Sequence, residues 1–228
     1  MQEILQFLKR HPYFAGLPQP ALEEIARLVR RRKASRGEQI LIEGEPPASA
    51  YFVVHGQVRI YRLSPSGREQ ALMDIFPGQT FNLVSAVDGR PAPSSAVART
   101  DALLYAISRQ DFIRLMERYP SIAQAVLKDF ARRLRHMTAL VEDLALRTVS
   151  ERLARLLLRL AEAPRQDGAP AEDGERFTQQ DLANRLGTVR EVVSRTLHDF
   201  QEQGLITLER GRIVIRDRER LEALACSV

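Results

Sequence analysis

Hydrophobic positions divide the chain into a helical lead-in, a region of short strands and a helical remainder. In residues 1–33, leucine and isoleucine recur at helical spacing on either side of Pro18-Gln19-Pro20. We therefore expect one or two short helices in this segment. They end in the basic run of residues 30–33, which we interpret as a solvated face, with a DNA phosphate contact as the alternative.

From residue 34 to 107, short apolar runs alternate with turn residues. Glycine and proline recur between the runs, for example at Gly56 and at Pro77-Gly78. Such a succession is typical of an antiparallel sandwich or barrel. The runs that predict strands are 40–42, 51–54, 58–63, 71–76, 96–98 and 103–107.

Helices are predicted after the strands. Ser108 and Asp111 form a capping-box-like pair at the start of one helix, and Pro120 precedes a second one. Over residues 121–146, roughly 40 Å as a helix, charged residues flank a narrow apolar a/d seam, which we expect to face an identical partner rather than the chain's own core. The seam consists of Leu127, Phe130, Leu134, Met137, Val141 and Leu144.

A further helix is predicted beyond the seam. Thr148 and Glu151 have capping-box spacing, and leucines continue at helical spacing as far as Leu160. The break before Thr148 is therefore an expected domain boundary and hinge. Residues 164–174, which are rich in proline, glycine and aspartate, predict a loop.

The most informative segment has the pattern of a helix-turn-helix. Thr178 is placed to cap a helix over residues 179–186, and Gly187 permits a sharp turn. Thr188 is placed to cap the second helix, with Glu191 at the capping-box position.

The second of these helices divides into two faces. At about 100° per residue, the apolar arc contains Val189, Val192, Val193, Thr196, Leu197 and Phe200, and the polar arc contains Arg190, Glu191, Ser194, Arg195, His198 and Gln201. The polar arc suits base reading, because arginine donates two hydrogen bonds to guanine and a carboxylate accepts one from cytosine. The residues that we expect to read bases are Arg190, Glu191, Ser194 and Arg195.

A two-stranded wing is predicted to follow. Its strands are residues 205–208 and 212–215, with Arg210-Gly211 at the tip. Contacts with the DNA backbone would supply salt-sensitive, sequence-neutral affinity. The residues that we assign to such contacts are Thr178, Gln179, Thr188, Arg210 and Arg212.

Composition bears on the compartment and the partner. The formal net charge of +5 and a pI of about 9.8 suit a polyanionic partner. No run of about 18 apolar residues predicts a membrane span, and the N-terminus lacks the hydrophobic block of a signal peptide. We expect a cytoplasmic protein without membrane contact. The single cysteine, Cys226, allows no internal disulfide or thiolate cluster, so we expect no metal and no cofactor.

The motifs of both halves together resemble the cyclic AMP receptor protein and fumarate–nitrate regulator (Crp–Fnr) family, over about residues 4–216. The motifs are Gly37-Glu38, Gly44-Glu45, Gly56-Gln57-Val58, Pro77-Gly78, Ala131-Arg132-Arg133-Leu134 and Arg190–Arg195. The resemblance implies an α+β protein with a double-stranded β-helix (jelly-roll) sensor at 1–119, a dimerisation helix at 120–146 and a winged helix-turn-helix at 147–228.

The same resemblance implies a homodimer that regulates transcription. It would bind a near-palindromic operator in double-stranded DNA and work together with RNA polymerase. In family members with this motif, the residues equivalent to Arg190, Glu191 and Arg195 read a GTGA-like half-site. Whether genes are activated or repressed is not implied.

The chain departs from the family's cyclic-nucleotide site. Members that bind a cyclic nucleotide carry a Gly-Glu pair, whose glutamate takes the ribose hydroxyl, and an Arg-Ser pair, whose arginine takes the phosphate. This chain has Asn82-Leu83 and Ser94-Ser95 instead, and Met137-Thr138 where a purine-contacting polar pair is expected. We therefore expect no usual cyclic AMP site and leave the effector open. The residues that would line an effector pocket are Gly78, Asn82, Leu83, Ser94, Ser95 and Thr138.

Other functions compete with this interpretation. The winged helix could bind a protein instead of DNA, although its arginine and glutamate side chains are better suited to bases than to a protein interface. An enzyme is disfavoured, because the sequence has no nucleophile elbow, phosphate loop or metal-ligand spacing. His55 and His136 could in principle ligate haem, but an isolated histidine is more often a surface or packed residue.

Overall fold

The computed structural model describes residues 1–46, 48–162, 178–209 and 212–226. The chain divides into two compact units. Met1–Arg62 and Leu72–His136 form the first, which we call the sensor unit, and Leu63–Ala71 and Met137–Val228 form the second, which we call the reader unit.

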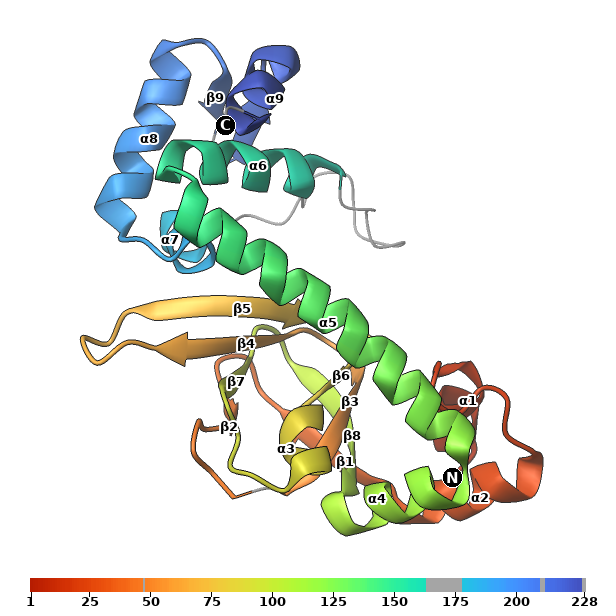
Figure 1. Cartoon of the computed structure of the whole chain (residues 1–228). Helices are drawn as coiled ribbons and strands as arrows, with labels where there is room; N and C mark the ends of the chain where they lie inside the picture. Colours follow the sequence, from red (N-terminus) through yellow and green to blue (C-terminus); the bar gives the residue numbers. More distant parts are fainter. Residues whose placement is uncertain (47, 163–177, 210–211, 227–228) are drawn as a thin grey trace. The chain divides into compact units, whose positions relative to one another are not determined.

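The sensor unit is built around two four-stranded sheets (Figure 1). The first has the order β1-β8-β3-β6, with β1 at Arg30–Ala34, β8 at Ala102–Ser108, β3 at Ser49–His55 and β6 at Thr80–Phe81. The second has the order β2-β7-β4-β5, with β2 at Gln39–Leu41, β7 at Ser95–Ala98, β4 at Val58–Leu63 and β5 at Glu69–Ile75. Each strand predicted from the sequence is confirmed, and its ends differ from the prediction by no more than two residues.

Alternation of side chains along β3 and β8 creates two cores. Tyr51 and Val53 point into the space between the two sheets, where the Tyr51 ring stacks on Phe81 at 4.9 Å. Ala50 and Phe52 point to the opposite face, as strand periodicity requires. β3 and β8 are therefore apolar on both faces, which explains why their sequences read as continuous hydrophobic runs.

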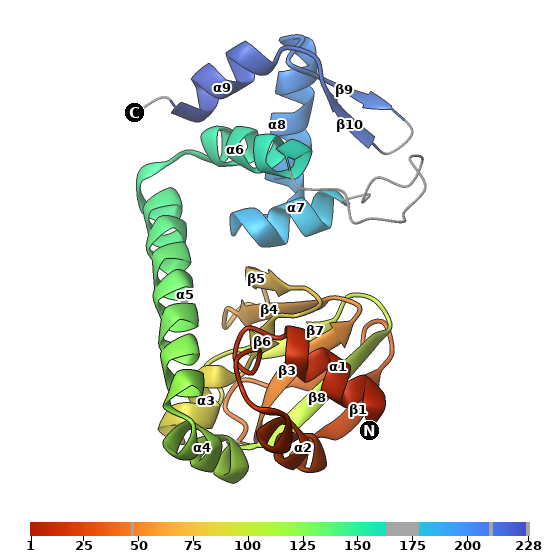
Figure 2. The same ribbon diagram turned by 90° about the vertical axis from the view of Figure 1, so that its right-hand side faces the viewer.

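Helices cover the outer face of that sheet (Figure 2). Their bounds are α1 Gln2–Arg10, α2 Gln19–Leu28, α3 Leu83–Asp88, α4 Arg109–Arg118 and α5 Pro120–Leu146. The predicted helical lead-in is thus confirmed as two helices. The predicted cap of α4 is confirmed as well, because the Asp111 backbone N–H donates to Ser108 Oγ at 3.2 Å.

Three elements of the sensor unit are not predicted by the sequence: β1, β6 and α3. The basic run at residues 30–33 is a strand and not the end of the helical lead-in, because its backbone pairs with β8 from Arg30↔Ala106 to Lys33↔Leu103. β1 is an edge strand of its sheet. Consecutive basic side chains on an edge strand discourage pairing with another chain.

Helix α5 has two contrasting faces. Ile122 and Val126 are buried in the sensor core. In the seam predicted from the sequence, Leu127, Leu134 and Val141 are 66%, 69% and 65% exposed, at a spacing of seven residues. Phe130, which the sequence assigns to the same seam, packs partly against the sensor core, so for this residue the expectation is wrong. The single chain leaves Leu127, Leu134 and Val141 uncovered.

A polar cluster fixes the buried face of α5 to the sensor unit. Its centre is Asp129, which is 3% exposed. Tyr13 Oη donates to Asp129 Oδ2 at 2.6 Å, and Thr80 Oγ1 lies 3.0 Å from the same hydroxyl. Arg132 and Arg133 donate to the two carboxylate oxygens, and Arg133 also donates to the Thr80 carbonyl. The cluster joins the N-terminal segment, β6 and α5.

Burial and hydrogen bonding shift the pKa values in and near this cluster. Burial opposes ionisation of Asp129, but the hydrogen bonds from Tyr13, Arg133 and Arg132 and the charge of Arg133 prevail and hold its pKa below the usual range. Burial and the bond to Asp129 raise the pKa of Tyr13. Burial lowers the pKa of His11 to about 4, although Asp129 and the Gly78 backbone act in the opposite direction. His11 is therefore neutral at pH 7, and its Nδ1 accepts a hydrogen bond from the Tyr13 backbone N–H.

The reader unit has its own hydrophobic core, formed chiefly by α6, α7, α8 and α9. The bounds of its elements are α6 Val149–Glu162, α7 Gln179–Leu186, α8 Arg190–Glu202, β9 Ile206–Glu209, β10 Arg212–Ile215 and α9 Arg218–Cys226. The capping box predicted at the start of α6 is confirmed: Glu151 Oε2 accepts from the Thr148 N–H at 2.8 Å and Thr148 Oγ1 accepts from the Glu151 N–H at 3.3 Å. The loop predicted at 164–174 lies outside the described residues.

We predict that His11 makes the sensor unit lose stability in mild acid. The unfolded chain takes up a proton near pH 6.5 and the folded unit only near pH 4, so between these values the unfolded state binds more protons. Stability should therefore fall by roughly 3 kcal/mol as the pH falls through this window. All five tyrosines lie in the sensor unit and the chain has no tryptophan, so tyrosine fluorescence during urea unfolding reports on this unit.

The comparison variant is His11→Phe, which keeps an aromatic ring among Phe7, Phe14 and Phe52. Its stability should approach that of the wild type as the pH falls from 7 to 4.5. His55→Asn, at the exposed end of β3, is the surface control. A stability difference between wild type and His11→Phe that stays constant with pH would contradict the prediction.

Candidate nucleic-acid interface

The turn between α7 and α8 is built by local hydrogen bonds. Thr178 Oγ1 accepts from the Asp181 backbone N–H at 3.0 Å, and Asp181 Oδ2 accepts from the Thr178 N–H at 3.3 Å, so the predicted cap is a reciprocal capping box. Gly187 ends α7 with φ 65°, a left-handed conformation that favours glycine. The predicted helix, turn and second helix are all confirmed.

The cap predicted for the second helix is wrong. Thr188 does not cap α8; Val189 occupies the N-cap position, with no side-chain hydrogen bond. The Thr188 N–H instead donates to the Ala183 carbonyl at 3.1 Å and so helps to close the end of α7. The turn therefore needs one more residue than the capping pattern predicted.

The two faces of α8 are close to those expected. Val193, Leu197 and Phe200 lie in the reader core. Val189 is an exception, because it is exposed at the end of the turn. The polar arc is exposed along its whole length: Arg190, Glu191, Ser194, Arg195, His198 and Gln201.

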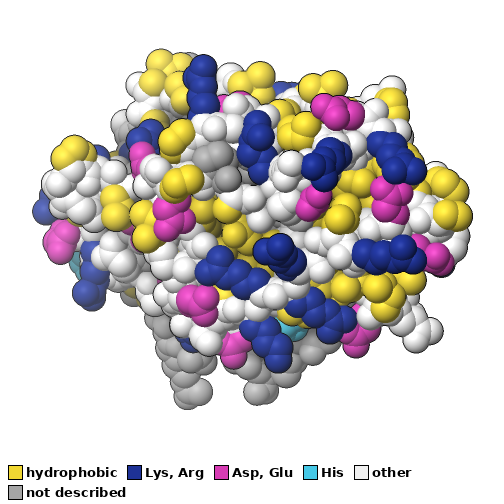
Figure 3. Space-filling view, turned by 90° about the horizontal axis from the view of Figure 1, so that it is seen from below, with side chains coloured by type: hydrophobic (Ala, Val, Ile, Leu, Met, Phe, Trp, Pro, Cys, Tyr) yellow, Lys and Arg dark blue, Asp and Glu magenta, His cyan; other side chains and the backbone are white. Residues whose placement is uncertain are grey.

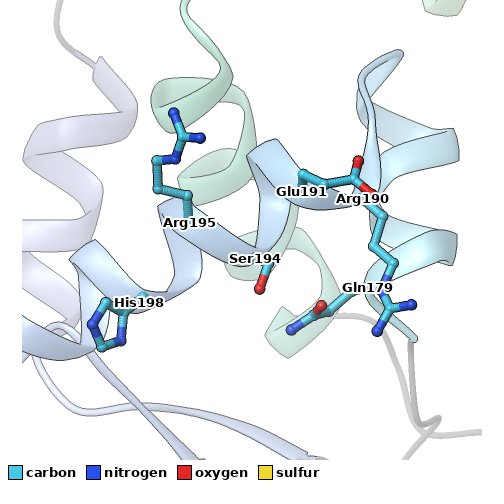
Figure 4. Close-up of a pocket in the computed structure, with 6 residues that line it drawn as sticks. All are labelled: Gln179, Arg190, Glu191, Ser194, Arg195 and His198. Atoms are coloured by element: carbon cyan, nitrogen blue, oxygen red, sulfur yellow. The ribbon is translucent and has the colours of Figure 1, made fainter.

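The exposed arc forms one wall of a shallow concavity of about 510 Å³ (Figure 4). Gln179, at the start of α7, lies beside Ser194 and Arg190 of α8, and Arg195 extends away from them. Hydrogen-bond donors and acceptors thus line this concavity on the exposed face of α8. The concavity is lined by Gln179, Arg190, Glu191, Ser194, Arg195 and His198.

The wing lies beside this helix in the reader unit. β9 and β10 pair antiparallel, with Arg212 opposite Glu209. Arg212 is half-buried, and Arg216 forms an ion pair with Glu209. Arg210, predicted to contact phosphate from the tip, lies outside the described residues.

The residues considered for an effector pocket are mostly engaged in the framework of the sensor unit. Leu83 is 2% exposed and packs in the core beneath the helices. Asn82 has φ 58° and donates from Nδ2 to the Ser49 carbonyl at 2.9 Å. Ser95 Oγ accepts from the Glu43 backbone N–H at 3.0 Å. Ser94 is half-buried, Gly78 is exposed, and Thr138 is exposed on the part of α5 that belongs to the reader unit.

In the part of the chain that the structure describes, the distribution of charge and of metal-binding side chains outside this concavity indicates no further site. On the face that carries α2 and α4, Asp and Glu side chains lie between the Lys and Arg side chains, so that face is not one continuous basic patch (Figure 3). Within the described residues, no group of three or more His, Cys, Asp or Glu side chains is arranged to hold a metal ion. None of the described helices is long and apolar enough to cross a membrane.

These features define a class of protein: a jelly-roll sensor joined by a long helix to a winged helix-turn-helix. Comparison with known families agrees. Residues 31–119 match the cyclic nucleotide-binding domain family, and residues 151–224 match the Crp-like helix-turn-helix domain family.

Individual relatives cover nearly the whole chain. The CRP-like cAMP-activated global transcriptional regulator of Mycobacterium tuberculosis is 32% identical over 95% of this chain and 97% of its own length. The cyclic AMP receptor protein of Thermus thermophilus is 32% identical over 96% and 98%. The solved structure of FixK2 from Bradyrhizobium japonicum is 27% identical, covers 88% of this chain and 98% of that one, and has a TM-score of 0.71. The chain belongs to the Crp–Fnr family of transcription regulators.

Two further residues, Gln179 and His198, line the concavity beside the four residues that the sequence predicts to read bases. Gln179, for which the sequence predicts a contact with the DNA backbone, lies beside the base-reading candidates, and its backbone contact stays a prediction. His198 lies on the predicted polar arc, where the sequence assigns it no role, and it lines the same surface. Its position eight residues after Arg190, on the same face of α8, is the signal in the sequence that groups it with the residues of this concavity.

Proposed function

We propose that this regulator binds, as a homodimer, a near-palindromic operator with GTGA-like half-sites. The observation that carries the proposal is the exposed row on α8, which combines Arg190, Arg195 and the carboxylate of Glu191. The opposite face of α8 packs in the reader core. Arg190 and Glu191 stand in the first turn, the part of a recognition helix that reaches base edges. A rigid support is what base reading requires, because specificity depends on hydrogen bonds of fixed direction.

Each polar side chain then has a distinct part in recognition. Arg190 and Arg195 can each donate two hydrogen bonds to a guanine, and Glu191 can accept from a cytosine amino group. Ser194 lies between them, and its hydroxyl can donate a hydrogen bond to a base or accept one from it. Gln179, Thr178 and Arg212 would contact phosphates, which adds affinity without sequence preference.

Two recognition helices per operator require two chains, and α5 supplies a suitable surface. Leu127, Leu134 and Val141 recur every seven residues and are exposed in the single chain. Burying a leucine or valine side chain stabilises an assembly by about 1.5–3 kcal/mol. On the opposite face of α5, Ile122 and Val126 are covered by the sensor core, and Phe130 of the seam packs partly against that core as well. The exposed seam residues Leu127, Leu134 and Val141 would therefore make the contact with a second copy.

We further propose that the sensor does not bind cyclic AMP in the family's usual way, although two of the relatives are named for that ligand. Leu83 offers no acceptor for a ribose hydroxyl and is packed in a core. Ser94 offers no positive charge for a phosphate, and burying an unpaired anion is costly. The sensor therefore accepts a different, less charged ligand, or the dimer binds DNA without one.

Arg190→Ala should weaken operator binding by about 1–3 kcal/mol and relax preference at one guanine. The operator is first selected from a random duplex library, and affinities are then measured for it and for random DNA. Arg212→Ala, on the wing, is the matched arginine control and should weaken both DNAs alike. An equal loss on both DNAs for Arg190→Ala would remove that residue from base reading. The selected half-sites should lie about two helical turns apart, or another whole-turn spacing.

Charged residues in the seam should abolish the dimer. Leu134→Glu together with Met137→Glu places two like charges at the contact, and light scattering should then report a monomer that binds the operator weakly. Arg135→Glu, an exposed change on the same turn, is the control and should leave the dimer intact. A wild-type chain that is already monomeric at micromolar concentration would show that the seam is not a dimer contact.

Titration calorimetry with cyclic AMP and cyclic GMP tests the sensor. We expect no binding at micromolar concentration and no effect on operator affinity, because the carboxylate and guanidinium anchors are missing. Micromolar or tighter cyclic AMP binding that also raises operator affinity would contradict the prediction. Arg90→Ala and Arg99→Ala would then show which arginine replaces the missing one.

A further inference from the structure

The recognition helix carries a titratable side chain that the proposed base contacts do not use. His198 lines the same concavity as Arg190, Ser194 and Arg195, and stands toward the far end of the row (Figure 4). Its side chain is 70% exposed, and its Nε2 lies 3.3 Å from Glu202 Oε1. An imidazole is therefore presented on the surface that would face DNA.

The geometry of the helix places this imidazole near phosphate rather than near bases. Eight residues separate Arg190 from His198, which is about 12 Å along a helix axis. The major groove of B-DNA is also about 12 Å wide. When the first turn of α8 reaches the base edges in the middle of the groove, a side chain two turns further along lies beyond half of that width, where the phosphates are.

We propose that His198 is a protonation-dependent phosphate contact, so that operator affinity rises as the pH falls from 8 to 6. The proposal rests on the proposed function, because it requires α8 to lie in the major groove. Histidine gains its positive charge between about pH 8 and pH 5. Phosphate oxygens favour the charged imidazole, so the complex binds more protons than the free protein. By linkage, a falling pH then strengthens binding.

The charged groups around the imidazole do not cancel this effect. The charged side chains nearest the imidazole are Glu202, at 3.3 Å from Nε2, and Arg195, three residues away on the same face; both are present before and after DNA binds. The neighbouring helix α7 contributes only the uncharged Gln179 to the concavity, and α6 and β9, which also pack on α8, contribute no lining residue among those described. The phosphates are thus the charges that change on binding.

The test is operator affinity of the full chain at pH 6, 7 and 8 and at fixed salt, for wild type, His198→Gln and His198→Lys. Between pH 8 and pH 6 the wild-type complex should tighten about three- to tenfold more than the His198→Gln complex. His198→Lys keeps its charge throughout, so it should bind at pH 8 as tightly as the wild type does at pH 6. In the wild type, the dependence of log affinity on log salt should steepen at pH 6 by about one for each histidine.

Identical pH responses of wild type and His198→Gln would overturn the proposal. Arg190→Ala serves as the internal control: it should lose discrimination between operator and random DNA but keep the pH response, since phosphate is present in both. If the wild type selects no operator at any pH, the proposed function itself fails, which is a different result from a pH-independent operator complex.

Discussion

A buried carboxylate, together with the packing of Ile122 and Val126 in the sensor core, fixes the first half of α5 to the sensor unit. Asp129 receives hydrogen bonds from Tyr13, Arg132 and Arg133, and Thr80 lies within 3.3 Å. Losing one partner of a buried charge costs about 3–5 kcal/mol. The cluster therefore fixes which face of α5 turns inward. The exposed seam is the consequence of that choice, because Leu127 and Leu134 lie on the face that Asp129 leaves outside.

A second aspartate has the corresponding position at the other end of the helix. Asp143 is buried in the reader unit and lies 3.2 Å from both Arg147, in the junction between α5 and α6, and Arg155, on α6. The capping box of Thr148 and Glu151 closes the same junction. Local hydrogen bonds and a shared carboxylate thus define how α6 begins. The reader core is built on α6, so this junction positions the helix-turn-helix within its unit.

The sequence predicted features with local causes and missed those with distant ones. The helix starts at Ser108, Thr148 and Thr178 follow from side chains that bond three residues ahead, which spacing alone reveals. β1 became a strand because it pairs with β8, about 70 residues later, and its basic composition carries no sign of that partner. The cap predicted at Thr188 is wrong because of the neighbouring helix: the Thr188 N–H donates to the Ala183 carbonyl at the end of α7, so α8 begins one residue later.

The contrast between local and distant causes also explains why candidate residues are easier to choose from the sequence in the reader unit than in the sensor unit. The residues proposed for base recognition lie on one helix, so they follow from a repeat of 3.6 residues and the two faces that it creates. A ligand pocket in a jelly roll is instead assembled from several strands, and its chemistry depends on which side chains the sheets turn inward. Leu83 is an example. The sequence shows that this position lacks the glutamate of the family motif, but only the structure shows that the leucine belongs to the hydrophobic core. A ligand that replaced cyclic AMP would have to be recognised by other groups than the pair that the family motif places there.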